Sequence, residues 1–174
     1  ELANMFMLSI PYGKPMIYSG YAFSDRDAGP KVAANGKTAD ATCPSAPSAA
    51  TVGKVALGNF VCTHRWAGIT GMIQWRDVVG TEKPAAYVNK GNAYGFSRGK
   101  LGFVLFNSGP TRFIGTVKTL LPAGTYCNQA VTGTLKAKVD CATTARIVVA
   151  KDGSAKVNMA GWSAVAISKA SRLK

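Results

Sequence analysis

The sequence has 174 residues, of which 47% are apolar and 17% are charged, below the roughly 25% charged residues of a typical soluble domain. This composition can build a hydrophobic core, which excludes wholesale disorder, and no stretch approaches the about 18 consecutive apolar residues of a membrane span. The formal net charge is +13, which would attract polyanions. The basic residues are scattered singly without a nucleic-acid-binding signature, so solvated surface lysines are favoured over a dedicated polyanion site.

For the N-terminal part of the chain, the sequence predicts one short helix, one short strand and a long loop. Residues 2–9 carry apolar side chains at helical spacing, which predicts a short buried helix ending before Pro11. A short buried strand is expected at Met16–Ser19, and residues 24–59 follow as a long loop rich in Asp, Gly, Ala, Ser, Lys and Pro. The chain begins at Glu1 within the apolar pattern and without a signal peptide, so we expect a processed or truncated chain.

A second helix is predicted over residues 61–79, where apolar residues recur three or four positions apart. Two glycines within it weaken its intrinsic propensity by about 1 kcal/mol each, so packing must hold it. Gly80 is a natural C-terminal cap. Trp66 and Trp75 are interpreted as core residues rather than as a platform for sugar.

From Pro84 onward short strands alternate with turn residues, which is typical of an all-β domain. The run Leu101–Asn107 is apolar on both faces and therefore predicts a central strand. The spacing of strands and turns favours an antiparallel Greek-key β-sandwich. The predicted strands are Tyr94–Ser97, Leu101–Asn107, Phe113–Thr119, Gly124–Cys127, Ala145–Val149, Lys156–Met159 and Ala164–Ser168.

The cysteines Cys43, Cys62, Cys127 and Cys141 do not have metal-binding spacing, because none forms a Cys-x-x-Cys pair and His64 lies only two residues after Cys62. We therefore expect two disulfides, for which three pairings are open. Local pairing of Cys43 with Cys62 and of Cys127 with Cys141 closes two modest loops, each contributing roughly 3 kcal/mol in the chain-entropy model. Disulfides indicate an oxidising compartment.

The residues that could carry catalysis are few. His64 is the one histidine, and its place beside a probable disulfide favours a hydrogen-bonding role at a helix start over a nucleophilic centre. Glycoside hydrolysis needs two carboxylates about 5–9.5 Å apart. Only Asp25 and Asp27 are suitable neighbours, and a pair of aspartates in a loop is more often a solvated turn. The residues alone therefore assemble no active site.

Several segments nevertheless form a specific pattern in order and spacing. They are Ala3–Gly13, Tyr18–Phe23, Asp27–Pro30, Val61–Trp66 with Ile69 and Met72, Gly95–Asn107, and Leu121–Cys127. This pattern resembles secreted α-amylases of the animal and actinobacterial type, in the part that follows their last catalytic aspartate. The resemblance covers nearly the whole chain, apart from an expanded loop between Cys43 and Cys62.

The resemblance implies a fold. Residues 1–80 would be the C-terminal remnant of a (β/α)8 barrel, with one strand and two helices: the penultimate helix, the eighth strand and the final helix. Residues 81–174 would be the family's antiparallel Greek-key β-sandwich, so that the chain is mostly β overall. The resemblance also implies the pairings Cys43–Cys62 and Cys127–Cys141 and a secreted, extracellular protein.

The resemblance also implies a function for the intact parent protein, which would hydrolyse internal α-1,4-glucosidic bonds of starch or glycogen by a retaining mechanism. The catalytic carboxylates of such enzymes lie on earlier barrel strands, and this sequence has no Asn-His-Asp motif. The chain alone is therefore expected to be inactive, with no catalytic residue. Only Asp27 matches a position near the substrate cleft, which makes it the candidate substrate-binding residue.

Ligands and partners follow from the same resemblance. Calcium is expected in the intact parent through upstream residues, with no metal ligand in this chain, and chloride is not expected because Met16 stands where a basic ligand would lie. The expected partners are an α-glucan substrate and the missing N-terminal part of the barrel, without specific nucleic acid or a membrane span. The competing hypothesis is a non-catalytic β-sandwich that binds carbohydrate or a polyanion through exposed Trp162, Tyr94 or Tyr126.

Overall fold

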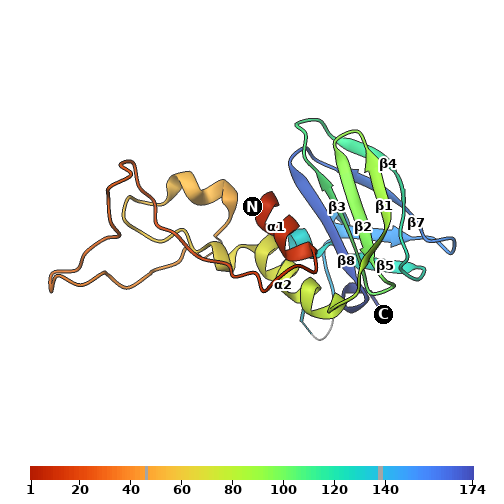
Figure 1. Cartoon of the computed structure of the whole chain (residues 1–174), viewed down its shortest axis with the longest axis horizontal. Coiled ribbons are helices and arrows are strands. Elements are labelled where there is room, and N and C mark those ends of the chain that lie inside the picture. Colours follow the sequence, from red (N-terminus) through yellow and green to blue (C-terminus); the bar gives the residue numbers. More distant parts are fainter. Residues whose placement is uncertain (46, 137–138) are drawn as a thin grey trace. The chain divides into compact units, whose positions relative to one another are not determined.

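The computed structural model describes residues 1–45, 47–136 and 139–174. They form two compact units, one made of Glu1–Pro15 with Ala67–Lys174 and the other of Met16–Trp66. The first unit contains two antiparallel sheets with two longer helices beside them (Figure 1). The fold is therefore mostly β with a small helical part, as the sequence predicts. The domain boundary near residue 80 stays a prediction.

The two sheets form a Greek-key sandwich. The first has the strand order β1-β2-β3-β8 and the second β4-β7-β6-β5, with antiparallel neighbours throughout. In the second sheet β5, β6 and β7 lie side by side in chain order, and β4 pairs with the outer side of β7. This arrangement is a Greek key. The strands are β1 Pro84–Lys90, β2 Ala93–Arg98, β3 Gly102–Asn107, β4 Phe113–Lys118, β5 Gly124–Cys127, β6 Arg146–Val149, β7 Ser154–Met159 and β8 Ser163–Ser168.

The hydrophobic core lies between the sheets. All residues of β3 are buried between β2 and β8, which confirms the predicted central strand. Burial of each large apolar side chain there stabilises the fold by roughly 1.5–3 kcal/mol. Phe113 and Ile147 are partly buried at the margin of this core. Its buried residues include Phe103, Leu105, Val117, Val149 and Ile167.

Helices α1 (Leu2–Ser9) and α2 (Ala67–Val79) pack on the first sheet, on the face opposite to the core (Figure 1). Phe6 of α1 contacts Phe106 edge-on, with ring centroids 5.6 Å apart. Trp75 of α2 is fully buried, and its indole Nε1 donates a hydrogen bond to the Ile167 carbonyl of β8 at 2.9 Å. Trp66 is also buried, so both tryptophans are core residues as predicted.

A short helix, α3 (Gln129–Thr132), ties α2 to the sandwich. It begins after Asn128, whose side-chain oxygen accepts hydrogen bonds from Ala130 N at 3.1 Å and from Ala166 N of β8 at 2.8 Å. A β-carbon at Gly71 of α2 would lie 1.9 Å from the Gln129 carbonyl oxygen. Glycine is therefore needed at position 71 for close packing, which outweighs its poor helix propensity.

The second unit, Met16–Trp66, is mostly irregular. Its chain is held by bridges between Tyr21 and Phe60 and between Val32 and Thr38. The predicted strand at Met16–Ser19 is wrong: these residues form no strand, and Met16 is 85% exposed. A barrel strand is defined by hydrogen bonds to neighbours on both sides, and the described residues supply no such neighbours.

Two other boundaries differ from the sequence prediction. The helix expected over 61–79 begins only at Ala67, after a 3₁₀ turn. Strand β1 was not predicted, since it begins at a proline and contains a bulge between Ala85 and Val88.

The 3₁₀ helices are Ala49–Lys54, Thr63–Arg65, Thr143–Ala145 and Lys169–Ser171. Within the described ranges, no helix is long and apolar enough to span a bilayer.

Candidate functional site

Asp25 and Asp27, the two neighbouring aspartates considered in the sequence for catalysis or substrate binding, lie in one exposed turn of the second unit. The Asp25 carboxylate accepts a hydrogen bond from the Asp27 backbone N–H at 2.9 Å. Both residues are exposed. This geometry is that of an Asx turn, in which one carboxylate caps the local backbone. The two aspartates therefore do not form an acid/base pair facing each other across a substrate cleft, and the role of Asp27 near substrate stays a prediction.

Two other carboxylates are engaged in the sandwich. Hydrogen bonds from the Ser154 hydroxyl and backbone N–H, together with Lys118 at 3.1 Å, hold the pKa of Asp152 far below its ordinary value. Asp140 lies 3.3 Å from Arg146 and accepts the Cys141 N–H at 2.8 Å. A general acid needs a raised pKa and access to the leaving group. Asp152 has the opposite property and serves as a turn anchor.

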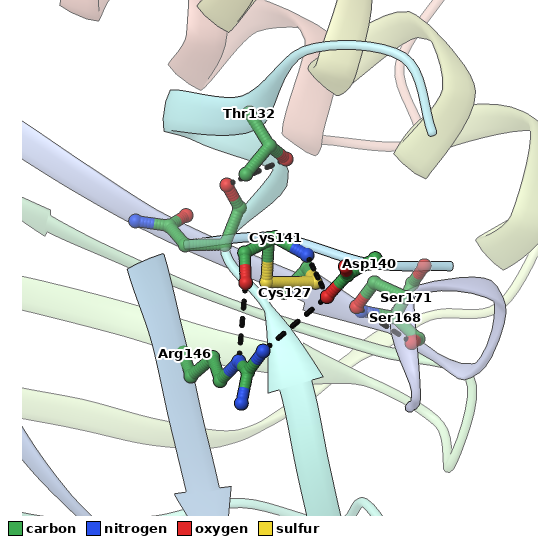
Figure 2. Close-up of a disulfide and its surroundings, with 8 residues drawn as sticks. Cys127, Thr132, Asp140, Cys141, Arg146, Ser168 and Ser171 are labelled. Carbon is green, nitrogen blue, oxygen red and sulfur yellow. Dashed lines mark hydrogen bonds and ion pairs between the residues drawn. A yellow bond between two sulfur atoms is a disulfide. The ribbon is translucent and has the colours of Figure 1, made fainter. Parts of the chain in front are cut away.

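Both disulfides pair locally, as expected. Cys43 is joined to Cys62 in the second unit, and Cys127 at the end of β5 is joined to Cys141. Figure 2 shows Arg146 reaching from β6 to this second disulfide, where its guanidinium donates to the Cys141 carbonyl at 3.1 Å and contacts Asp140. The segment before β6 is therefore held at two points, the disulfide and the arginine.

Arginine side chains join the helices to the first sheet. Arg98 of β2 is fully buried and donates to the carbonyls of Ser9 at 2.6 Å and Gly80 at 2.8 Å, and also to that of Glu82. Burial lowers the pKa of Arg98, with a smaller contribution in the same direction from Arg76. The accepted carbonyls lie at the C-terminal ends of α1 and α2, where a cation is favourable. Arg98 therefore has a structural role.

The remaining predicted site residues have no visible catalytic environment. His64 is exposed in the turn Thr63–Arg65, whose hydrogen bonds are made by the backbone. In the described ranges, no group of three or more His, Cys, Asp or Glu side chains could hold a metal ion. Every buried side-chain nitrogen or oxygen among these residues has a hydrogen-bond partner. Among the described residues, no buried polar side-chain atom is left unpaired as a contact for a buried ligand.

The three aromatic residues proposed as binding platforms differ from one another. Tyr126 is fully buried, and its hydroxyl donates to the Pro122 carbonyl at 2.7 Å, so its predicted exposure is wrong. Its alternation with the outward-facing Thr125 in β5 places it in the core. Tyr94 is 38% exposed in a cluster with Phe6 and Phe96, while Trp162 is 65% exposed. Of these three residues, Trp162 and Tyr94 can contact a ligand at the surface.

The sandwich can be assigned to a known class. Residues 87–170 match the family model of the α-amylase C-terminal all-beta domain. The sandwich is therefore similar to the C-terminal all-beta domain of α-amylases, over slightly less than half of the chain.

Curated relatives extend the similarity beyond the sandwich. The chain is 33% identical to an α-amylase of Tenebrio molitor over 166 residues, which is 91% of this chain and 32% of that protein. It is 34% identical to human α-amylase 1B over 89% of this chain and 30% of that protein. An α-amylase of Streptomyces violaceus is 32% identical over 73% of this chain and 20% of its own length. The chain thus spans a third or less of these relatives.

A solved structure has the same fold. The α-amylase I of Eisenia fetida aligns with a TM-score of 0.76 at 23% identity, covering 95% of this chain and 34% of that one. A mutant of the same enzyme, described with maltohexaose, aligns with a TM-score of 0.75. At this level of identity, the comparison supports the fold alone.

Proposed function

We propose that the chain is the C-terminal part of a secreted α-amylase that hydrolyses internal α-1,4-glucosidic bonds of starch or glycogen with retention of configuration. The observation that carries the proposal is the similarity to α-amylases over about nine tenths of the chain. In this account the catalytic carboxylates belong to upstream residues, and the 174-residue chain alone is inactive.

The arrangement of α1 and α2 supports this assignment. Both helices bury apolar side chains against the first sheet, and Arg98 binds carbonyls at the ends of both. The helices are therefore fixed to the sandwich by specific contacts rather than by a flexible linker. In the proposed enzyme, the sandwich would stabilise the end of the catalytic barrel, where these helices belong.

Several finer parts of the proposal concern ligands. Asp27 would contact the glucan near the substrate cleft, calcium would be held by upstream residues, and chloride would not be bound because Met16 replaces a basic ligand. The described residues contain no cluster that fits a metal ion, so no step of the reaction is assigned to calcium here. The two disulfides support an oxidising, extracellular location.

The parentage is tested by the natural protein that contains this chain. Its intact mass should be roughly three times 18.2 kDa, in keeping with the share of the relatives that the chain covers. The sequence upstream of Glu1 should contain an Asn-His-Asp motif within a few tens of residues. A natural protein of 18.2 kDa without an upstream barrel would overturn the proposal.

The second candidate function is carbohydrate binding by the sandwich itself. The observation that favours it is the exposed Trp162, which contributes little to the core. Binding and hydrolysis are compatible in one protein, because a surface site can hold a polymer while a distant cleft cleaves it.

A further inference from the structure

Trp162 combines exposure with an unusual backbone conformation. The residue lies in the connection between β7 and β8, is 65% exposed, and has φ of +51°, in the left-handed region. Bulky residues rarely adopt this conformation, and Gly, Asn or Asp would fit it with less strain. Neither core packing nor turn geometry therefore accounts for a tryptophan at position 162, and strained residues of this kind gather at functional sites.

The turn that carries Trp162 is held rigidly. The Trp162 backbone N–H donates to the Gly109 carbonyl at 2.9 Å, which joins two neighbouring connections. The buried Asn107 side chain donates to the carbonyls of Ala160 at 2.9 Å and Thr111 at 2.7 Å. The Ser163 hydroxyl also donates to Ala160, at 2.7 Å. These connections therefore fix the backbone that carries the indole before any ligand arrives, which lowers the entropy lost on binding.

A shallow hollow of about 160 Å³ adjoins the indole. The residues that line it include the apolar Met5 and Val131 and the polar Glu1 and Ser163. A pyranose ring has an apolar face of C–H groups, which stacks on an aromatic ring, and hydroxyls at its edge, which need hydrogen-bond partners. An exposed indole beside a half-polar hollow offers both kinds of contact.

We propose that Trp162 is the stacking platform of a surface site for an α-1,4-glucan chain on the sandwich. The choice of α-glucan rests on the proposed function above. The net charge of the chain is +13, which makes an anionic polymer the alternative ligand. No lysine or arginine side chain of the described residues lines the hollow to pair with an anion, whereas the neutral hydroxyls of a glucan suit it.

The test compares variants of the 174-residue chain by calorimetric titration with maltoheptaose. Trp162→Asn removes the indole and keeps a residue that tolerates the left-handed conformation, so it should fold at least as stably as the original while its affinity falls about tenfold or more. Trp162→Phe retains an aromatic ring and should lose less. Tyr87→Ala, which removes another exposed aromatic of the sandwich, is the matched control and should bind normally.

Four results would overturn the site. They are an original chain that does not bind maltoheptaose, equal binding by Trp162→Asn, loss of binding confined to Tyr87→Ala, and salt-sensitive binding of heparin in place of the glucan. Starch hydrolysis by the longer natural protein is measured separately. If that protein binds maltoheptaose through Trp162 but hydrolyses no starch, the surface site stands and the catalytic proposal fails. If the longer protein hydrolyses starch and Trp162→Asn binds maltoheptaose normally, the catalytic proposal stands and the surface site fails.

Discussion

Arg98 joins segments that are far apart in the sequence, because its guanidinium reaches the carbonyls of Ser9, Gly80 and Glu82. A planar group with several fixed donors can satisfy these carbonyls together, and a lysine cannot. The helical part and the sandwich are therefore connected through one buried cation. No periodicity in the sequence indicates this connection, since Arg98 lies between two predicted strands and resembles an ordinary surface residue there.

The first prediction concerns this residue. Arg98→Met should destabilise the protein by about 3 kcal/mol, because it leaves buried carbonyls without donors, and Arg98→Lys should have a smaller effect in the same direction. Urea unfolding measures the change. Arg112→Met is the control: Arg112 is exposed and binds only Asn158, so its loss should change the free energy of unfolding by no more than about 0.5 kcal/mol. Equal effects of Arg98→Met and Arg112→Met would contradict the assigned role.

The second prediction concerns the buried phenol of Tyr126. Burial raises the pKa of Tyr126 in the folded protein, opposed by the smaller influence of Arg172. The neutral form is favoured by folding, so this contribution is fully present below the unfolded pKa of about 10 and is lost as the pH rises through the higher folded value. The free energy of unfolding should therefore fall above about pH 10. In Tyr126→Phe this fall should be smaller.

Tyr12→Phe serves as the comparison for this titration, because Tyr12 is 85% exposed. Its stability profile should follow that of the original protein over the whole alkaline range. If Tyr126→Phe also followed the original profile, the phenol would not be linked to folding in the way that its burial requires.

Among the elements, the strands that alternate clearly or are wholly apolar could be predicted from the sequence. β3 is the clearest case, since Leu101–Asn107 has apolar residues on both faces. β1 could not be predicted, because its bulge near Ala86 and its proline interrupt the alternation. The buried Tyr126 was also misplaced, since the face that a four-residue strand turns inward depends on the partner strand as much as on its own sequence.

The candidate site was less predictable than the fold. Trp162 could be singled out as a large aromatic residue, but its left-handed conformation and the bonds from Asn107 depend on contacts between distant turns. The Met16–Ser19 strand failed for a related reason, since a strand needs pairing partners and the described residues supply none for this segment. Local pattern carries little information about such partners.

The third prediction concerns which unit each of the two disulfides stabilises. The second unit has few ladder hydrogen bonds, so we expect the Cys43–Cys62 bond to hold it, whereas the sandwich has two complete sheets besides its own disulfide. In Cys43→Ala/Cys62→Ala, amide exchange over residues 16–66 should accelerate strongly while β3 stays protected. In Cys127→Ala/Cys141→Ala, the sandwich should lose roughly 3 kcal/mol. Loss of β3 protection in the first double variant would show that the sandwich depends on the second unit.

At the scale of the whole molecule, the chain provides a stable sandwich, two helices fixed to it and an irregular second unit. The first unit buries its own core and satisfies its own ladders. Asp25, Asp27, Asp140 and Asp152 are engaged in turns or ion pairs, not in a facing pair. In the proposed function, the catalytic carboxylates belong to upstream residues. Trp162 would add polymer binding to that function.

Hydrolysis of soluble starch tests this account most directly, measured as reducing-sugar release at equal molar concentrations of the 174-residue chain and of the longer natural protein. The account predicts background release by the chain alone and strong release by the longer protein, because only the latter carries the catalytic carboxylates. Release by the chain alone that disappears in Asp25→Ala or Asp27→Ala would contradict it, since an active site would then exist within these residues. Background release by the longer protein would equally contradict the proposed parentage.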